Sequence, residues 1–225
     1  MSCMRYRSKK FYKWDSNIAY LTGLIAADGC IVNNGRHLNV TSKDIELINH
    51  TQLILDMNVK FNLKRSILGG EAYNLQFSNV AFYDFLLDVG LTPAKSKTIP
   101  ELKVPDEYYP DFLRGYFDGD GTIYGFWDTR WKSSLMYYTG FTSASPAFLK
   151  WLSITNARLF RTSPGFMKKS PSADTLMYAK ADSYKLFEAM YYKPNLLYLG
   201  RKYTKFIDFF KSDPYANKAL LARVL

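Results

Sequence analysis

The sequence predicts an α+β protein made of two similar halves, and three observations carry this prediction. Two apolar, helix-like runs, YLTGLIAADGC (residues 20–30) and FLRGYFDGDGT (residues 112–122), each end in an acid followed by glycine. After each run, the spacing of apolar residues predicts two strands, a helix, two more strands and a helix. The segment between the halves, residues 91–110, is rich in proline and lysine. We therefore place the halves at residues 1–100 and 101–225.

In the first half, the apolar run is followed by a predicted hairpin that turns at Asn34-Gly35, a pair typical of tight hairpin turns. An amphipathic helix comes next, with Ser42 or Asp44 as its N-cap. Two alternating strands and a helix that stops at Gly90 complete the half. The predicted ranges are 30–42 for the hairpin, 44–57 for the helix, 59–68 and 72–78 for the strands, and 79–90 for the last helix.

The second half repeats this order. A strand pair is predicted first, and then a helix that has Pro146 in its first turn, where proline is favoured. A second strand pair and another helix follow, and the basic tail from Asn195 is predicted to be helical in part. The predicted ranges are 122–128 and 135–143 for the first pair, 145–157 for the helix, 166–170 and 175–181 for the second pair, and 183–192 for the next helix.

Composition indicates a polyanionic partner. The chain has 30 Lys plus Arg against 20 Asp plus Glu, a formal net charge of +10. It has only two cysteines and two histidines, with no zinc-ligand spacing and no disulfide framework. We therefore expect a reducing, intracellular location, such as an organelle or the bacterial cytoplasm. No apolar run is long enough to span a bilayer, so no membrane partner is expected.

Small residues recur four positions apart in both apolar runs. Gly23 and Ala27 form this pair in the first run, and Gly115 and Gly119 form it in the second. On a helix this spacing puts both residues on one face, and small residues let two helix backbones approach closely. We therefore expect the two helices to pack side by side about a pseudo-twofold axis, with their C-termini together.

Asp28 and Asp120 follow the last small residue of each run, so the helix pair would bring two carboxylates together. The helix dipoles make both C-termini negative, and like charges this close are unfavourable unless one is protonated or a cation binds. A divalent metal with oxygen ligands meets that need. Gly29 and Gly121 are predicted to take the left-handed conformation that ends a helix. Asp118 has no acidic counterpart in the first run, so we place it outside the metal pair.

Residues 21–29 (LTGLIAADG) and 113–121 (LRGYFDGDG) resemble the LAGLIDADG motif of homing endonucleases. The resemblance covers nearly the whole chain, because the order of elements after each motif also fits. The first copy departs from the motif at Ala26, where the family has aspartate, but this is not the position of the motif's catalytic acid. Two copies in one chain are similar to the single-chain, intron-encoded members that act as monomers.

The resemblance implies that each half is an αββαββα unit, that the motif helices form the interface between the halves, and that the antiparallel sheets form a saddle over double-stranded DNA. It implies cleavage of both strands of a long, mostly asymmetric target, which leaves short 3′ overhangs. The catalytic acids would be Asp28 and Asp120, which would hold Mg²⁺ or Mn²⁺ with the backbone carbonyls of Ala27 and Gly119. Ca²⁺ is expected to bind without supporting cleavage.

The family often adds a basic residue in each half near the scissile phosphate. Lys95 and Lys97 are the candidates in the first half, and Lys202, ahead of Arg201 and Lys205, is the candidate in the second. Lys95 and Lys202 are preferred as catalytic residues because each lies just after a leucine and a turn signal. A lysine there can stabilise charge that develops on the phosphate. The alternative for each is a solvated surface lysine.

The predicted strands carry the interpretation of DNA binding. Alternation places one set of polar residues on a single sheet face, and this set is rich in the donors that suit base edges and phosphates. Tyrosines of the second half could equally pack in a core. The predicted DNA contacts are Asn34, His37, Asn39, Thr41, Lys60, Asn62, Lys64, Ser66, Asn74, Gln76 and Ser78 in the first half, and Tyr124, Tyr138, Lys168, Tyr178 and Lys180 in the second.

Three other functions remain open from the sequence. An intron maturase would bind intron RNA as a splicing cofactor, with or without residual nuclease activity. A DNA-binding regulator would use the same fold without catalysis, although the presence of both acids argues against it. A basic α+β domain with coincidental motifs is the simplest alternative, and the doubled motif argues against that.

Overall fold

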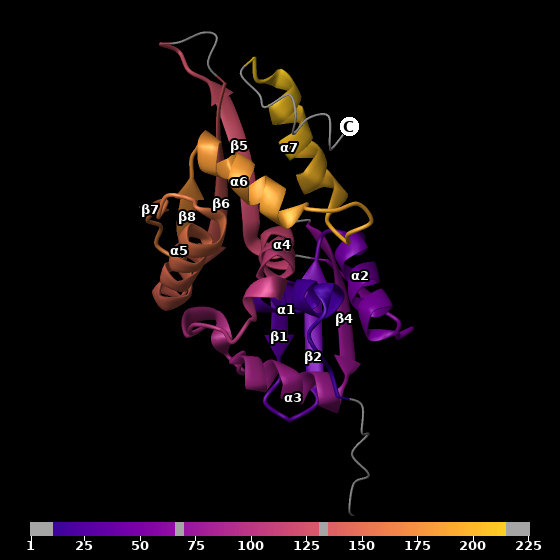
Figure 1. The fold of residues 1–225 in the computed structure, drawn as a ribbon. Helices are drawn as coiled ribbons and strands as arrows, with labels where there is room; N and C mark the ends of the chain where they lie inside the picture. Colours follow the sequence, from indigo (N-terminus) through magenta and orange to yellow (C-terminus); the bar gives the residue numbers. More distant parts are fainter. Residues whose placement is uncertain (1–10, 66–69, 131–134, 215–225) are drawn as a thin grey trace, which may run out of the picture.

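Figure 1 shows the computed structural model of the protein, which describes residues 11–65, 70–130 and 135–214. The first repeat contains α1 (Ser16–Asp28), β1 (Gly29–Ile31), β2 (His37–Ser42), α2 (Ile45–Leu55), β3 (Asn62–Arg65), β4 (Glu71–Ser78) and α3 (Val80–Val89). The second contains α4 (Tyr109–Asp120), β5 (Gly121–Trp127), β6 (Leu135–Ser143), α5 (Pro146–Phe160), β7 (Phe166–Lys168), β8 (Asp174–Tyr178) and α6 (Lys180–Met190), and α7 (Gly200–Ser212) follows it. The predicted α+β fold with two αββαββα repeats is confirmed. The boundary at residue 100 stays a prediction.

Each repeat contains one four-stranded antiparallel sheet. The strand orders, β1-β2-β4-β3 and β5-β6-β8-β7, are the same when the repeats are compared. In the first sheet, Leu38 pairs with Phe77 and Val40 with Leu75, and all four side chains are buried on the side of the helices. The alternate residues point to the opposite side, which we call the open face of each sheet. Within the described part of the chain, no helix has the length and apolar character needed to cross a membrane.

Helices α1 and α4 meet between the two repeats, near the centre of the molecule (Figure 1). A Cβ atom on Gly23 would overlap the carbonyl oxygen of Phe112 and lie 2.7 Å from the backbone nitrogen of Tyr116. On the other helix, a Cβ atom on Gly115 would overlap the carbonyl oxygen of Tyr20. Because these neighbours are backbone atoms, only glycine fits at either position. The predicted close approach of the two helices is therefore confirmed.

The prediction for Gly29 and Gly121 is wrong. Both residues are extended, with φ of −83° and −81°, and each is the first residue of a strand. Glycine is needed here for another reason, because a Cβ atom on Gly29 would lie 2.7 Å from the carbonyl oxygen of Ile25. A Cβ atom on Gly121 would overlap Phe117 in the same way. Each strand thus leaves its helix directly, against the last helical turn.

Short polar residues set the beginnings of several helices. The side chains of Asp15, Asn79 and Ser145 each accept a hydrogen bond from the backbone N–H three residues later. Pro146 occupies the first turn of α5, as predicted. Asp44 precedes α2, but its carboxylate makes no capping hydrogen bond. The N-cap position at Asp44 is therefore confirmed, but its carboxylate binds Arg201 and not the helix backbone.

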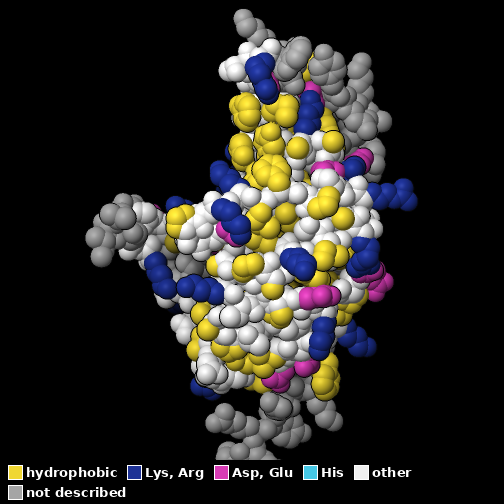
Figure 2. Space-filling view, turned by 90° about the vertical axis from the view of Figure 1, so that its left-hand side faces the viewer, with side chains coloured by type: hydrophobic (Ala, Val, Ile, Leu, Met, Phe, Trp, Pro, Cys, Tyr) yellow, Lys and Arg dark blue, Asp and Glu magenta, His cyan; other side chains and the backbone are white. Residues whose placement is uncertain are grey.

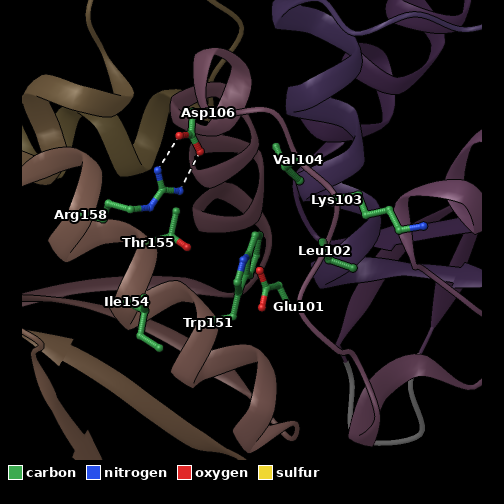
Figure 3. Close-up of a pocket in the computed structure, with 9 residues that line it drawn as sticks. All are labelled: Glu101, Leu102, Lys103, Val104, Asp106, Trp151, Ile154, Thr155 and Arg158. Carbon is green, nitrogen blue, oxygen red and sulfur yellow. Dashed lines mark hydrogen bonds and ion pairs between the residues drawn. The ribbon is translucent and has the colours of Figure 1, made fainter.

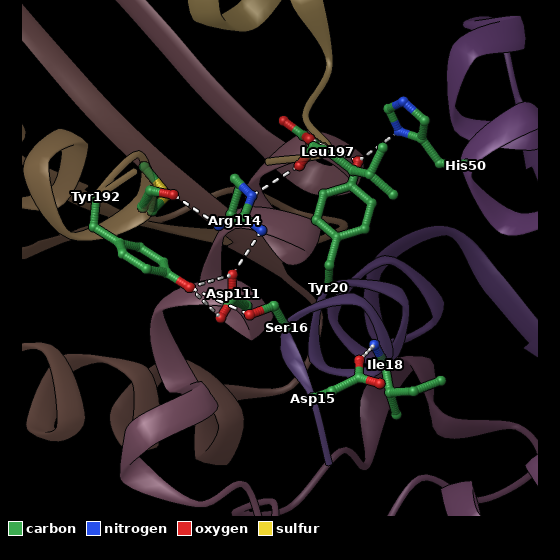
Figure 4. A network of polar contacts seen from close by, with 11 residues as sticks. Asp15, Ser16, Ile18, Tyr20, His50, Asp111, Arg114, Tyr192 and Leu197 are labelled. Carbon is green, nitrogen blue, oxygen red and sulfur yellow. Dashed lines mark hydrogen bonds and ion pairs between the residues drawn. The ribbon is translucent and has the colours of Figure 1, made fainter. Parts of the chain in front are cut away.

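A buried arginine connects α4 to the segment that leads into α7 (Figure 4). Arg114 is 1% exposed and donates 2.7 Å from Nη2 to Asp111, 2.8 Å from Nη1 to the carbonyl of Met190, and 2.8 Å from Nε to the carbonyl of Leu197. The Tyr192 hydroxyl donates 3.1 Å to the same aspartate. With its charge paired and its N–H groups bonded, this arginine is stable in the core.

A pocket of about 320 Å³ lies between the segment that connects the repeats and α5 (Figure 3). An ion pair between Arg158 and Asp106 bridges one side of it, and Trp151 lines it nearby. None of the predicted site residues lines this pocket. The candidate site is therefore elsewhere, at the ends of α1 and α4.

Candidate metal centre and nucleic-acid face

The two motif acids are the last residues of the paired helices. Asp28 ends α1 and is half-buried, and Asp120 ends α4 and is more exposed. The Asp28 carboxylate lies against α4, because a Cβ atom on Gly119 would be 3.3 Å from its Oδ2 atom. Burial, and then repulsion from Asp120, raise the pKa of Asp28 to about 6. Partial loss of solvation also raises the pKa of Asp120.

Lys95 lies just after the first repeat, in a short 3₁₀ turn (Lys95–Lys97). Its side chain is buried, and Nζ donates a 2.8 Å hydrogen bond to the carbonyl oxygen of Ala26, near the end of α1. The backbone of Ala94, with φ of 58°, turns the chain at this point. Lys97 is exposed, so the structure places Lys95 rather than Lys97 beside the acids.

Lys202 occupies the equivalent place beside α4. It lies in the first turn of α7, is buried, and directs Nζ at the end of the other motif helix. Its ammonium group donates to the carbonyl oxygens of Phe117 at 2.6 Å, Asp118 at 2.9 Å, Gly119 at 3.0 Å and Gly121 at 2.6 Å. A cation at this point compensates the negative end of the helix dipole.

The alternative basic residues of the second half point away from the acids. Arg201 is exposed and binds the Asp44 carboxylate through two hydrogen bonds of 2.7 Å, and Lys205 is exposed. Burial lowers the pKa of Lys95 and of Lys202 to about 8, although the nearby aspartates oppose the shift. Both ammonium groups therefore remain largely charged at neutral pH, in contact with the helix ends.

The donor atoms at the helix ends fit a hard divalent cation. Two carboxylates stand next to backbone carbonyls of Ala27 and Gly119, and an all-oxygen set is the one that Mg²⁺ prefers. Burial and repulsion from Asp120 both raise the pKa of Asp28, and a cation bound beside the carboxylates would oppose that shift. The Gly119 carbonyl already accepts from Lys202, but a carbonyl oxygen has a second lone pair. Among the described residues no group of three acids, histidines or cysteines forms a metal site, so DNA oxygens or water would complete the ligand set.

A pocket of about 200 Å³ opens beside Asp120 and Lys95. Ser143 lines it, and its Oγ atom accepts a 3.1 Å hydrogen bond from the Ser145 backbone. Ser42 makes the same contact with the Asp44 backbone in the first repeat, also at 3.1 Å. These serines therefore stabilise the turns beside the acids.

Asp118 is a structural carboxylate, as its place outside the metal pair predicts. It is 1% exposed and accepts 2.8 Å hydrogen bonds from the Tyr20 hydroxyl and from the Leu199 backbone N–H. Burial raises its pKa to about 6. Because Leu199 immediately precedes α7, Asp118 fixes the start of the helix that carries Lys202. The sequence signal for this role was an acid inside an apolar run.

Removing the Asp28 charge is expected to stabilise the metal-free fold. The pKa of Asp28 is about 6 in the folded chain against an ordinary value of 3.8, so its ionisation disfavours folding. Asp28→Asn should therefore raise the free energy of unfolding at pH 7.5, in EDTA, by up to about 3 kcal/mol. The gain should disappear as the pH falls from about 6 towards 3.8, where wild-type Asp28 is protonated.

Urea unfolding at pH 7.5 and pH 4.5 checks this expectation. Asp208→Asn, at an exposed position of α7, is the control for removal of an acid. An equal stability change for Asp28→Asn at both pH values would contradict the raised pKa of Asp28 in the folded chain.

The open face of the first sheet carries the predicted polar residues. Cross-strand pairs put His37 opposite Ser78, Asn39 opposite Gln76, and Thr41 and Asn62 opposite Asn74, and Lys64 shares the face. Asn74 is buried in this row, since it donates to Asn39 and, at 2.7 Å, to Thr41.

The remaining first-half predictions lie around this face. Asn34 is exposed in the hairpin turn, where Gly35 has φ of 74° and the Asn34 side chain accepts from the His37 backbone at 3.0 Å. Lys60 is exposed just before β3. Ser66 lies outside the described residues.

In the second sheet, the structure separates the predicted residues into two groups. Tyr124, Tyr138 and Lys168 lie on the open face. Tyr178 does not, because its register pairs it with buried Thr139. It is 0% exposed, and its hydroxyl accepts 3.0 Å from Asn156.

Lys180 is also placed elsewhere, at the start of α6. Its Nζ atom binds Asp213 at 2.6 Å and lies over the ring of buried Tyr137. The positions predicted for Tyr178 and Lys180 on the DNA-facing side are therefore wrong. Strand alternation left two faces possible for Tyr178, and only the strand pairing decides between them.

Comparisons with known proteins agree with this arrangement. Residues 15–72 match the family model described as a LAGLIDADG-like domain. None of the curated proteins compared with the chain matches it. The chain is similar to the homing endonuclease I-WcaI bound to its DNA recognition sequence, with a TM-score of 0.60, 15% identity, and coverage of 89% of each chain.

Two further solved structures show the range of proteins with this fold. The meganuclease I-SmaMI bound to uncleaveable DNA has a TM-score of 0.60 and 14% identity, again with 89% of each chain covered. The N-terminal LAGLIDADG domain of WhiA has a TM-score of 0.57 and 14% identity, with 84% of this chain and 87% of that chain covered. The chain therefore contains a LAGLIDADG-like domain and has the two-repeat fold of the single-chain LAGLIDADG homing endonucleases.

Proposed function

We propose that the protein is a monomeric, site-specific DNA endonuclease that makes metal-dependent double-strand breaks with short 3′ overhangs. One observation carries this proposal: each paired helix ends in an aspartate, and each has a buried lysine bonded to its last turn. Two equivalent half-sites at one interface suit a reaction performed once on each strand. The DNA-bound state of similar proteins supports the choice of duplex DNA as the substrate.

Asp28 and Asp120, with the carbonyls of Ala27 and Gly119, would hold Mg²⁺, which supplies a Lewis acid for phosphodiester hydrolysis. Water would add to the phosphorus and the bond to the 3′ oxygen would break. Lys95 and Lys202 hold their charge at the edge of the site and would stabilise the additional negative charge on the phosphate. Their contacts with helix-end carbonyls keep them positioned before DNA binds.

The acids, rather than the fold, favour a nuclease over a DNA-binding regulator. The same fold occurs in WhiA, so overall likeness alone does not imply cutting. A regulator has no need of two neighbouring carboxylates at one helix-pair end, where burial and then repulsion from Asp120 raise the pKa of Asp28. The open face of the first sheet would supply polar contacts to base edges and phosphates.

Lys64→Ala is expected to weaken DNA binding and to reduce its dependence on salt. The Lys64 side chain is exposed on the open face, where a phosphate contact would release counterions. Losing one such contact should reduce the slope of log K against log salt by about 0.9. Titration of a fluorescent duplex at several salt concentrations measures this slope.

Arg65→Ala is the matched control, because Arg65 is adjacent in β3 but lies on the other face, paired with Glu71 at 2.9 Å. Equal slopes for Lys64→Ala and the wild type would remove Lys64 from the phosphate contacts.

The proposed function is tested by incubating the protein and Mg²⁺ with a large randomised pool of duplex DNA and sequencing the new ends, with Asp28→Asn in parallel. Cuts at one long site with short 3′ overhangs, absent from the variant, are the expected result. Tight duplex binding without cuts would favour the regulator. Preferential binding to structured RNA without cuts would favour the maturase.

A further inference from the structure

The start of α7, the helix that carries Lys202, is held by carboxylates from other helices. Leu199 stands at its N-cap position, and its apolar side chain makes no capping hydrogen bond. Instead, Glu46 of α2 accepts a 3.1 Å hydrogen bond from the Gly200 N–H, and Asp118 of α4 accepts one of 2.8 Å from the Leu199 N–H. Carboxylates at a helix start satisfy free N–H groups and are favoured by the helix dipole. The first turn of α7 therefore depends on α2 of the first repeat as well as on α4.

An ion pair fixes the next residue of α7 to the same part of the first repeat. Arg201 donates from Nε and Nη2 to the two carboxylate oxygens of Asp44, each at 2.7 Å, and this contact lowers the pKa of Asp44. A single exposed ion pair adds little stability, but a bidentate pair also fixes the direction of the side chains. Helices α2 and α7 lie on the right in Figure 1, and on the opposite side of the molecule Figure 2 shows charged side chains spread over the surface. The residue directly before Lys202 is thus bound to the first repeat.

The segment that carries Lys95 is held by the second repeat in a similar way. The Ser145 hydroxyl, at the equivalent turn before α5, donates a 2.7 Å hydrogen bond to the carbonyl oxygen of Ile99. Ser145 is 1% exposed, and Ser143 of the same turn lines the pocket beside Lys95. This contact is neutral, whereas those at α7 involve charges. Each lysine segment is therefore held by the repeat that it does not follow in the chain.

These contacts bear on the position of the Lys202 ammonium group. Its Nζ atom is in contact with four carbonyl oxygens at 2.6 to 3.0 Å, so a shift of the first turn of α7 would move it relative to the acids. A displacement of about 1 Å can lower a rate about a hundredfold. The geometry of this small group therefore depends on contacts that cross from one repeat to the other.

We propose that Asp44 and Glu46 of the first repeat are positioning residues for Lys202, and that Ser145 of the second repeat is the positioning residue for Lys95. The inference rests on the proposed nuclease. Each repeat then controls the lysine that serves the opposite half-site, and the two DNA strands respond to different contacts across the interface.

Strand-resolved cleavage of the duplex found in the pool experiment tests this proposal, with a different label on each strand. Asp44→Ala combined with Glu46→Gln should slow cutting of one strand at least about tenfold more than cutting of the other. Lys202→Met should slow the same strand. Ser145→Ala and Lys95→Met should both slow the opposite strand. Equal slowing of both strands by the Asp44 and Glu46 double variant, or normal cutting, would overturn the proposal.

Acetylation of lysine side chains, followed by mass spectrometry without DNA or metal, reports the position of Lys202 apart from cutting. The Asp44 and Glu46 double variant should raise the acetylation rate of Lys202 by about fivefold or more, because the first turn of α7 opens more readily. An unchanged rate at Lys95 shows that the rest of the fold is kept. The matched control is Asp88→Ala with Asp208→Asn, which removes two exposed acids elsewhere. Unchanged acetylation of Lys202 in the first double variant would overturn the proposal.

A double-mutant cycle tests whether Asp44 acts through Arg201. Asp44→Ala and Arg201→Ala should each slow the same strand, and the two changes together should do no more than either alone. Weaker duplex binding by Arg201→Ala, with normal cutting by Asp44→Ala, would show that Arg201 serves the DNA and would overturn the positioning role of Asp44.

This inference and the proposed nuclease fail in different ways. Wild-type cutting without strand bias in the Asp44 and Glu46 double variant would overturn this inference alone. A wild-type protein that does not cut would overturn the proposed nuclease, while faster acetylation of Lys202 in the double variant would still show that the first repeat positions this lysine.

Discussion

Asp28→Asn and Asp120→Asn are each expected to abolish double-strand cutting, by about a thousandfold or more, while duplex binding is kept. Each change removes the negative charge of one of the two carboxylates that end the paired helices. The shape of the side chain stays nearly the same, so the helix pair should be unaffected. Cleavage rates on the duplex found in the pool experiment, and binding in Ca²⁺, measure the two effects separately.

The control is Asp208→Asn, which removes an acid from the exposed side of α7 and should cut normally. Mg²⁺ and Mn²⁺ should support cutting by the wild type, and Ca²⁺ should support binding alone. Loss of binding together with cutting would indicate that the carboxylates hold the fold or the DNA rather than the metal. Normal cutting by either asparagine variant would remove that acid from the active site.

Gly115→Leu is expected to destabilise the protein by at least about 3 kcal/mol, at or beyond the upper end of ordinary overpacking. The first added carbon would already overlap the carbonyl oxygen of Tyr20, and a backbone atom in the middle of α1 cannot move aside without shifting the helix. Gly115→Ala should also destabilise, although alanine favours helix by about 1 kcal/mol over glycine. Because the two acids lie at the ends of this helix pair, the change should also lower cutting.

Gly200→Ala is the matched control for this interface. A Cβ atom there meets only the Glu46 carboxylate, at 3.6 and 3.7 Å, which is ordinary contact. Urea unfolding of the three variants compares their free energies of unfolding. Full stability of Gly115→Leu would contradict the close backbone packing between α1 and α4.

Much of the candidate site could be predicted from the sequence, because its parts are local. Small residues four apart identify the face of a helix, and an acid directly after them lies at the helix end. The choice between Lys95 and Lys97 is different, since both are lysines in one turn. The left-handed backbone at Ala94 and the contact with the Ala26 carbonyl decide it, and neither is visible in a residue pattern.

Tertiary contacts also explain the residues that the sequence placed wrongly or missed. The strand around Tyr178 has apolar residues at both alternating positions, so the sequence does not show which of them face the core. The pairing of this strand with β6 decides it. Asp118 and Arg114 stand inside an apolar run, and their partners come from residues 20 and 190–199, far away in the chain. Long-range hydrogen bonds of this kind leave no periodic signal.

The sequence by itself determined that the chain has two repeats and in which order their helices and strands come. It also determined on which face the two motif helices pack and which two acids end them. These features follow from periodicity and from residue size along one segment. Only the tertiary structure decided which lysines reach the helix ends, why glycine follows each acid, and which side of the second sheet Tyr178 occupies. Those features depend on how separate segments approach one another, and the distance between two backbones is a property of the folded chain.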